Sequence, residues 1–291
     1  MIDYLIGVDG GGTGTRVRLA GRDGVELAQG TSGPSGLAHG IGPAWNSVND
    51  AVGKAFAIIG IDAIPMHRCA IGLGLAGVHN KEWAAEFAAA NPGYAALALD
   101  TDGFTTLMGA HQGRPGTIVA IGTGSVGEAL LANGDKREVG GWGFPAGDEG
   151  SGAWMGLRAV NYIQQVIDGR ARGGALAQAV IEACGGSRDA IQLWLGKATQ
   201  TTFAGLARHV LMHADDPVAR AILEDAGREV AKHAAALDPA GELPLALCGG
   251  LGEYLRPYLP PDLLARCAAP HGDSANGALR MIELHLKEQD Q

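Results

Sequence analysis

The chain has 291 residues, of which 46% are hydrophobic and 18% are charged, and its formal net charge is −9. This composition is typical of one large or two ordinary globular domains, and it argues against a disordered chain. The negative charge argues against binding nucleic acid or an anionic membrane by bulk attraction. Any bound phosphate therefore has to be held locally, by backbone donors, a metal or a few cations.

Targeting and metal signals are absent from the pattern of residues. No basic segment precedes an apolar run at the N-terminus, and no stretch approaches the roughly 18 apolar residues of a membrane span. HExxH spacing does not occur among the histidines. No CxxC pair occurs among the four scattered cysteines, Cys69, Cys184, Cys248 and Cys267. We expect a cytoplasmic protein without a structural metal.

The first third of the chain alternates strands and helices. Residues 3–10, 15–21 and 25–30 are joined by short turns and predict three consecutive antiparallel strands. Helical spacing follows at residues 43–60, and a strand, a helix and a strand are expected at residues 68–77, 80–90 and 94–100. This order predicts a mixed sheet covered by helices, which is the plan of a ribonuclease-H-like domain.

The pattern restarts near residue 117. Strands are predicted at residues 117–122, 126–132 and within 133–143, and a largely helical region follows from 153 to 237. A further strand at 243–250 and an amphipathic helix at 276–288 end the chain. We expect an α/β protein with two such domains flanking a cleft. The N-terminal domain spans residues 1–113, with the helix at 273–288 packing back on it, and the C-terminal domain with its helical insertion spans 114–272.

Two GxGxxG sequences raise the alternative of nicotinamide binding. The first, Gly72 to Gly77, follows a predicted strand and precedes a helix, but three strands and a helix come before it. The second, Gly122 to Gly127, leaves too few residues before the next turn for a crossover helix. A Walker A sequence does not occur.

The glycine-rich turns after two predicted strands favour phosphate binding over simple hairpins. Glycine allows backbone N–H groups to approach phosphate oxygens, and clustered N–H groups form an anion-binding nest. Hydroxyl donors are added by Thr13, Thr15, Thr123 and Ser125. Asp9, at the end of the first strand, is a candidate ligand of Mg²⁺ or its waters.

Four segments, "GVDGGGTGTR", "IGTGS", "GGWGFPAGDEGSGAWMG" and "LCGGLGEY", occur in this order. Over nearly the whole chain they resemble the N-acetylglucosamine and glucosamine kinase branch of the BadF/BadG-type ATPases. That branch belongs to the actin, sugar-kinase and Hsp70 superfamily, so the resemblance implies actin-like ATPase domains around a nucleotide and sugar cleft. It also implies ATP-dependent phosphorylation of an amino sugar at its 6-hydroxyl, with ATP and Mg²⁺ required.

The resemblance assigns roles residue by residue. It implies that Asp102 is the catalytic carboxylate and that Asp9 holds the metal. The nucleotide-binding positions that it implies are Gly11, Gly12, Thr13, Thr15, Gly122, Thr123, Gly124, Ser125, Gly249, Gly250 and Gly252. The sugar-binding positions that it implies are Ser35, Gly36, Asp102, Gly141, Trp142, Gly143 and Asp148. The related kinases carry an asparagine in the sugar loop, and here "TSGPSGLAHG" has none, which leaves the substituent at C2 open.

Several of these residues also have simpler interpretations. Asp102 is also a good N-cap for a helix that begins at Gly103, and Asp100 is the alternative base. Asp148 is suited to the dipole of the following helix, although its glycine neighbours favour a contact with a sugar hydroxyl. Trp142 fits either stacking on a pyranose ring or filling the core.

Two other functions remain open at this stage. The family also contains activator ATPases of 2-hydroxyacyl-CoA dehydratases, whose iron–sulfur cluster needs loop cysteines, and here Cys248 has no second cysteine nearby. A sugar-sensing relative without turnover is the other alternative, although the retained Asp9 and Asp102 argue against it. We expect a small-molecule amino sugar as partner, with neither nucleic acid nor membrane. A homodimer remains open.

Overall fold

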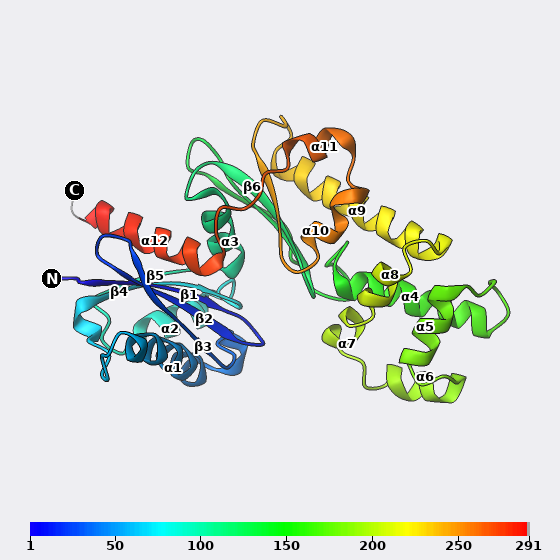
Figure 1. Cartoon of the computed structure of the whole chain (residues 1–291), viewed down its shortest axis with the longest axis horizontal. Helices are drawn as coiled ribbons and strands as arrows, with labels where there is room; N and C mark the ends of the chain where they lie inside the picture. The colour runs from blue at the N-terminus through cyan, green and yellow to red at the C-terminus, as the bar shows by residue number, and fades with distance from the viewer. Residues whose placement is uncertain (290–291) are drawn as a thin grey trace. The chain divides into compact units, whose positions relative to one another are not determined.

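Two β-sheets organise the chain, and each belongs to a separate unit (Figure 1). The structure is a computed structural model, and it describes residues 1–289. Unit 1 consists of residues 1–115 together with the C-terminal segment that begins at 269, and unit 2 consists of residues 116–268. The chain therefore passes from one unit to the other twice.

The sheet of unit 1 has the strand order β3-β2-β1-β4-β5. Its strands are β1 (Tyr4–Gly10), β2 (Thr15–Gly21), β3 (Glu26–Ser32), β4 (Cys69–Leu75) and β5 (Ala96–Asp100). The first three strands are antiparallel, as the sequence predicts, while β4 and β5 continue the sheet parallel to β1. Because β1, β4 and β5 are parallel, their carboxyl ends meet at one edge, which is where ligands bind in sheets of this kind.

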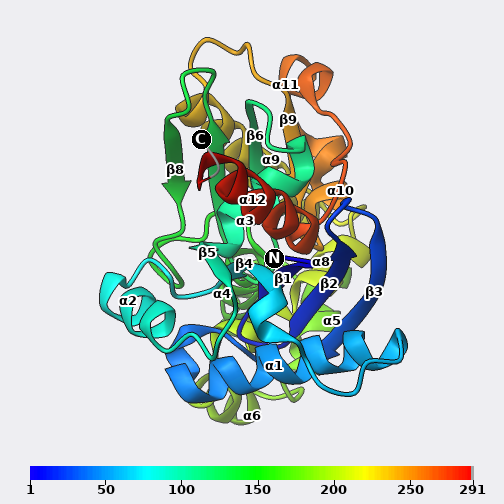
Figure 2. The same ribbon diagram turned by 90° about the vertical axis from the view of Figure 1, so that its left-hand side faces the viewer.

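Helices cover both faces of this sheet (Figures 1 and 2). One face is covered by α1 (Ile41–Ile58), whose apolar stripe of Trp45, Val48, Val52 and Phe56 is buried. The other face is covered by α3 (Asp102–His111) and α12 (Ser274–Gln289). Since both faces are covered, all seven residues of β4 are buried. The remaining helices of the unit are η1 (Leu37–His39), η2 (Met66–Arg68) and α2 (Lys81–Ala89).

Glycines allow α12 to lie against the sheet and against α3. A Cβ added at Gly72 would overlap the carbonyl oxygen of Ala278 in α12, and one added at Gly277 would overlap the carbonyl oxygen of Thr105 in α3. A Cβ at Gly74 would overlap the Thr105 hydroxyl. Gly72 and Gly74 lie inside β4 and serve helix packing, so the nicotinamide interpretation of this GxGxxG sequence is wrong.

The sheet of unit 2 repeats the first four positions of this plan, with the order β8-β7-β6-β9. Its strands are β6 (Gly116–Ile121), β7 (Ser125–Leu130), β8 (Lys136–Gly140) and β9 (Leu245–Cys248). The first three are again antiparallel, and β9 lies parallel to β6. The carboxyl ends of β6 and β9 therefore meet at one edge.

The helical region of unit 2 is interrupted at residues 168–174, 184–187, 196–199, 205–206 and 213–216. Its core is shared by α4 and α9 with strands β6 and β9, and it includes Trp154. The helices are α4 (Gly152–Ile167), α5 (Ala175–Ala183), α6 (Arg188–Leu195), α7 (Gln200–Ala204), α8 (Ala207–Met212), α9 (Pro217–Leu237), α10 (Gly252–Leu255), η3 (Arg256–Tyr258) and α11 (Pro261–Arg266).

Two expectations about the whole chain can be compared with the structure. All four cysteines are free thiols, and three of them are buried. Across residues 1–289, no helix combines the length and the apolar character needed to cross a membrane.

The contact of α3 with α12 leads to a first prediction. Gly277→Ala places a methyl group on the carbonyl oxygen of Thr105. We expect the free energy of unfolding to fall by ~1–3 kcal/mol, because the backbone has to move to make room. Gly53→Ala is the matched control. Its Cβ would lie 3.9 Å from Ile64 inside α1, so it is expected to be neutral or to stabilise by about 0.5–1 kcal/mol. Thermal and urea unfolding of both variants measure the difference, and equal stabilities would contradict this account of the glycine.

Candidate functional site

The first predicted phosphate loop is a tight turn between β1 and β2. The Gly11 N–H donates to the Gly14 carbonyl oxygen at 3.0 Å, which closes the turn. A Cβ added at Gly11 or Gly12 would meet no atom within 4 Å, and Thr13 is exposed. The outer side of this loop is therefore open to a ligand that approaches the backbone.

Thr15 and Ser35 support this loop from behind. The Thr15 hydroxyl is buried and lies 2.7 Å from both the Gly33 carbonyl oxygen and the Ser35 hydroxyl oxygen. The N–H groups of Ser35 and Gly36 both donate to the Gly11 carbonyl oxygen, at 3.2 and 3.0 Å. The predicted sugar loop thus lies directly against the predicted phosphate loop. The Thr15 side chain is used inside the protein and is not presented as a ligand donor.

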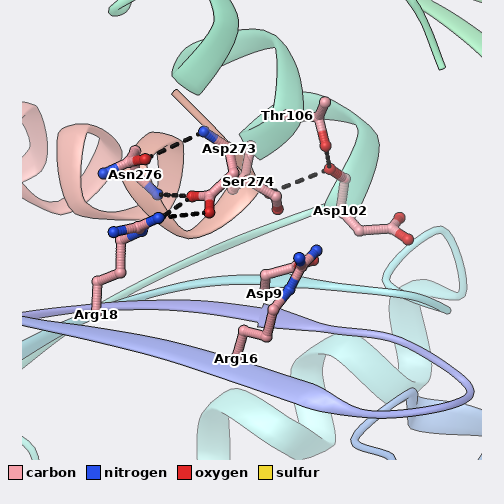
Figure 3. Close-up of polar contacts among 9 residues, drawn as sticks. Asp9, Arg16, Arg18, Asp102, Thr106, Asp273, Ser274 and Asn276 are labelled. Atoms are coloured by element: carbon pink, nitrogen blue, oxygen red, sulfur yellow. Dashed lines mark hydrogen bonds and ion pairs between the residues drawn. The ribbon is translucent and has the colours of Figure 1, made fainter. Parts of the chain in front are cut away.

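Asp9 lies near the end of β1 and pairs with Arg16 on β2 (Figure 3). Two guanidinium nitrogens donate to one carboxylate oxygen, at 2.6 and 3.1 Å. The Arg16 side chain is 65% exposed, so the pair contributes little to stability and its arginine is free to move. Sequence analysis missed Arg16, although its position across the hairpin from Asp9 follows from the register of β1 and β2.

Asp102 is the first residue of α3 and is separated from the end of β5 by Thr101. The N-cap is Thr101, whose hydroxyl accepts from the Phe104 N–H at 2.9 Å, so the N-cap interpretation of Asp102 is wrong. The Asp102 carboxylate accepts from the Gly103 N–H at 3.1 Å. Burial, and secondarily the negative charge of Asp9, raise the pKa of the Asp102 carboxyl above its ordinary value.

Asp100, the alternative base, ends β5 and accepts a hydrogen bond from the Thr101 N–H at 2.8 Å. It therefore closes the turn that leads into α3. Asp102 is the acidic residue in the first turn of that helix. A raised pKa on a carboxyl at the ligand-binding edge of a sheet is a signal of a functional group.

The helix that carries Asp102 is anchored by residues that sequence analysis missed (Figure 3). The hydroxyl groups of Thr105 in α3 and Ser274 in α12 are 2.8 Å apart and buried. Arg18 of β2 donates to both carboxylate oxygens of Asp273, at 3.1 and 2.7 Å. These contacts join the start of α12 to the sheet and to α3. No local pattern could have revealed them, because the partners lie 169 and 255 residues apart.

In unit 2, the predicted second phosphate loop joins β6 to β7 and touches two other segments. Its Gly122 and Thr123 carbonyl oxygens accept from the N–H groups of Gly152 and Ala153, which begin α4. The Leu251 N–H donates to the Ile121 carbonyl oxygen at 3.0 Å, which brings residues 249–252 to the same strand end. Gly122 and Gly250 have no atom within 4 Å of an added Cβ. Both loops thus present open backbone at the edge where β6 and β9 end.

Two of the remaining glycines in unit 2 are required by packing. Gly249 has a φ of +79°, and an added Cβ would overlap the Ile121 carbonyl oxygen. Gly252 begins α10 and is buried against Leu247. These two glycines let the segment turn closely over the end of β6, and Gly250 between them remains exposed.

Asp148 lies beneath the second loop. It is buried, has a φ of +63°, and accepts from the Ser125 N–H at 3.3 Å and from the Gln200 side-chain amide at 2.7 Å. The Ser125 hydroxyl donates to the Glu149 carbonyl oxygen at 2.8 Å, so it is also used within the protein. Burial raises the pKa of the Asp148 carboxyl. The structure therefore shows Asp148 as a support of the loop, and Gln200 as a partner that sequence analysis missed.

Trp142 lies between β8 and α4 and is 85% exposed, so the interpretation that it fills the core is wrong. Gly141 and Gly143 on either side have φ values of +69° and +83°. The Gly147 N–H donates to the Gly143 carbonyl oxygen at 2.7 Å, which closes a small loop beneath the tryptophan. By contrast, Trp45 and Trp154 are buried and Trp194 packs on the core.

The residues present fit a nucleotide with magnesium. Open glycine backbone at residues 11–12, 122 and 250 is the kind of surface that phosphate and ribose approach closely. Among residues 1–289, no cluster of three or more His, Cys, Asp or Glu side chains could hold a metal. That is compatible with Mg²⁺, which keeps most of its waters and binds one or two carboxylates plus substrate phosphates. Asp9 is the carboxylate beside the first loop.

The fold and these loops define the class of the protein. Two units with the same strand plan, each with glycine-rich turns at the ligand-binding edge, form the α/β fold of the actin-like ATPases and sugar kinases. The model of the BadF/BadG/BcrA/BcrD ATPase family matches residues 6–251. The chain belongs to this family.

Three relatives are similar over most of the chain. The glucosamine kinase of Vibrio cholerae is 32% identical over 281 residues, covering 96% of this chain and 95% of that protein. An N-acetylmuramic acid/N-acetylglucosamine kinase of Clostridium acetobutylicum is 27% identical, covering 78% and 76%. The crystal structure of a candidate N-acetylglucosamine kinase from Chromobacterium violaceum is 54% identical, with a TM-score of 0.93 and coverage of 97% and 99%.

The environment of Asp102 leads to a second prediction. A carboxyl whose pKa is raised in the folded state destabilises the protein once the pH exceeds its unfolded pKa of about 3.9. Asp102→Asn is therefore expected to raise the melting temperature at pH 7–8. The gain should shrink as the pH falls towards about 4 and vanish below about 3, where the wild-type carboxyl is protonated in both states.

Asp9→Asn provides the control for this measurement. It removes the second cause of the raised pKa, so the stabilisation by Asp102→Asn is expected to be smaller in that background. Melting temperatures of the four proteins across this pH range measure the effect. A gain that does not depend on pH would contradict the assignment.

Proposed function

We propose that the protein transfers the γ-phosphate of ATP to the 6-hydroxyl of an amino sugar, glucosamine or N-acetylglucosamine. The observation that carries the proposal is the position of Asp102. Its carboxyl has a raised pKa and lies at the edge of unit 1 where β1, β4 and β5 end, together with Asp9 and the open first loop. Similarity to a glucosamine kinase over 95% of that protein's length supports the sugar class.

Asp102 is proposed as the general base. The sugar O6 attacks the γ-phosphorus, the bond from that phosphorus to the bridging oxygen of ADP breaks, and the O6 proton passes to the Asp102 carboxylate. A raised pKa suits this role, because a base with a pKa closer to the working pH takes up the proton more readily. Positioning of the two substrates provides the rest of the catalysis.

The nucleotide is proposed to contact open glycine backbone in both units. In unit 1 the contacts are Gly11, Gly12 and Thr13, and in unit 2 they are Gly122, Thr123 and Gly250. Gly124 lies against the Asp148 carboxylate, 2.9 Å from an added Cβ, so it is proposed to shape the loop. Thr15, Ser125, Gly249 and Gly252 hold these loops in shape. Asp9 is proposed to hold Mg²⁺, which neutralises charge on the phosphates when bound. Arg16 then has to leave Asp9 or share it, and its exposure allows either.

The sugar is proposed to contact Asp102, the loop at Ser35 and Gly36, and the segment from Gly141 to Gly143. The Ser35 hydroxyl is engaged with Thr15, and the N–H groups of Ser35 and Gly36 are engaged with the Gly11 carbonyl oxygen, so a direct sugar contact here requires these partners to change. Trp142 offers an exposed aromatic face to the ring. Asp148 is buried beneath the loop between β6 and β7. It is proposed to affect the sugar by fixing the shape of that loop, or to contact the sugar after it releases Ser125 and Gln200.

The setting of the reaction follows from its substrates. We propose a cytoplasmic protein, because ATP is supplied there and four free cysteines suit a reducing compartment. An activator-type ATPase is not favoured, because the thiol of Cys248 is buried and burial raises its pKa to about 12. A cluster ligand has to be an accessible thiolate.

An ADP-release assay tests the function and provides a third prediction. With ATP, Mg²⁺ and either glucosamine or N-acetylglucosamine, we expect sugar-dependent ADP release, and no release with ATP alone. Asp102→Asn is expected to lower kcat by about 10²–10⁴-fold while the affinity for ATP stays nearly unchanged. Asp100→Asn is the control and should retain much more activity. ADP release without sugar, or near-normal turnover of Asp102→Asn, would count against the proposal.

Trp142 leads to a fourth prediction. Trp142→Ala is expected to raise KM for the sugar by about tenfold, the value of one aromatic contact, while the melting temperature does not change because the side chain is exposed. Trp154→Ala is the contrasting variant, since that tryptophan belongs to the core and its loss should lower stability. Steady-state kinetics and thermal unfolding separate the two. An unchanged KM in Trp142→Ala would remove Trp142 from the sugar site.

A further inference from the structure

A cavity lies in unit 1, at the opposite end of α3 from Asp102. Its volume is about 570 Å³, within the range of small-molecule sites, and all of its lining residues belong to unit 1. It is bordered by the end of α3 and by α12, which lie side by side (Figure 2). Met108, the first lining residue of α3, comes six residues after Asp102, so about 9 Å of helix separates this cavity from Asp102.

The lining is basic, although the chain as a whole is acidic. The lining contains the basic side chains of Arg114, His271 and Arg280 but only one carboxylate, that of Glu283. The amides of Gln112 and Asn276 add further donors. A local excess of positive charge in a chain with a net charge of −9 favours an anionic occupant.

Arg114 has unused hydrogen-bonding capacity. Unlike Arg16 and Arg18, it has no carboxylate partner among residues 1–289. Its two hydrogen bonds, to the His111 carbonyl oxygen and the Gln112 side chain, are both long at 3.4 Å. The side chain is exposed. A guanidinium in this state is ready to form a charge-assisted pair.

Arg280 is only partly satisfied as well. One terminal nitrogen donates to Glu283 at 2.9 Å, while its Nε is buried without a hydrogen-bond partner in the described part of the chain. A buried donor without an acceptor requires an explanation, and an ion in the adjoining cavity is one of the usual ones. Glu283 competes with such an ion for this guanidinium.

The backbone holds these groups in place. Gln112 and Gly113 have positive φ values of 55° and 72°, and the Gly113 N–H donates to the Met108 carbonyl oxygen, so the chain turns sharply after α3 and leads to Arg114. The His271 N–H donates to the Ala110 carbonyl oxygen at 3.0 Å, which fixes the segment before α12 to the same helix. The cavity is therefore built from both segments that connect unit 1 to the rest of the chain.

We propose that this cavity binds the phosphate group of a small phosphomonoester, with Arg114 and Arg280 as its main contacts. Phosphate is favoured because its three terminal oxygens can accept from two guanidinium groups and an amide together. The cavity is larger than phosphate alone requires, which leaves room for a group of sugar size. This inference does not depend on the proposed kinase activity.

Isothermal titration of the full chain tests the site, with inorganic phosphate and glucosamine 6-phosphate as separate probes. Both are expected to bind, and the sugar phosphate more tightly if the rest of the cavity is used. Arg114→Gln and Arg280→Gln should each weaken binding by about tenfold or more, the usual cost of losing a charged hydrogen bond. Glu283→Gln should strengthen binding, because it removes the competing carboxylate; this change in the opposite direction cannot result from misfolding.

Arg16→Gln is the matched control, since Arg16 is the cation beside the first glycine loop. It should bind inorganic phosphate like the wild type if the proposal is right. Wild-type affinity in both Arg114→Gln and Arg280→Gln would overturn the proposal, as would the absence of binding of both probes to the wild type. Loss of binding in Arg16→Gln alone would assign the phosphate to the glycine loops and would also overturn it.

Discussion

The close approach of α3 to α12 is the contact on which the arrangement of unit 1 depends. Gly277 lies against the Thr105 carbonyl oxygen, and the Thr105 hydroxyl contacts the Ser274 hydroxyl. The same hydroxyl occupies the position that a side chain at Gly74 in β4 would take. One threonine thus joins a strand, the helix that begins with Asp102, and the helix that ends the chain. A side chain at any of these glycines would push apart the elements that place Asp102 at the edge of the sheet.

The same edge explains why the candidate site is made of short loops. In each unit, the first strand and its parallel neighbour end together, and the turn after the first strand is glycine-rich. Buried side chains support these turns from below: Thr15 and Ser35 in unit 1, Asp148 in unit 2. The loops thereby combine an open outer backbone with a fixed shape, which preorganises N–H groups for a charged ligand.

Local patterns predicted the strands, the main helices and the glycine turns, because these depend on neighbouring residues. They could not distinguish a glycine that approaches a ligand from one that approaches a helix: Gly12 is open, whereas Gly72 lies against α12, 206 residues further on. They also could not decide whether Trp142 is exposed or buried, since the residues next to a tryptophan on a loop do not determine whether other segments cover it. The partners of Asp9, Asp148 and Thr105 were not predicted either.

The sequence by itself determined the succession of strands and helices along each unit, the two phosphate-type turns, and the family resemblance carried by motifs such as "GGWGFPAGDEGS". These features are encoded in periodicity and in residues adjacent along the chain. Only the tertiary structure decided which hydroxyl and carboxyl groups are used internally, which way the pKa of Asp102 shifts, and that two arginines line one cavity at the far end of α3. Those properties arise from burial and from contacts between distant segments, which a one-dimensional pattern does not contain.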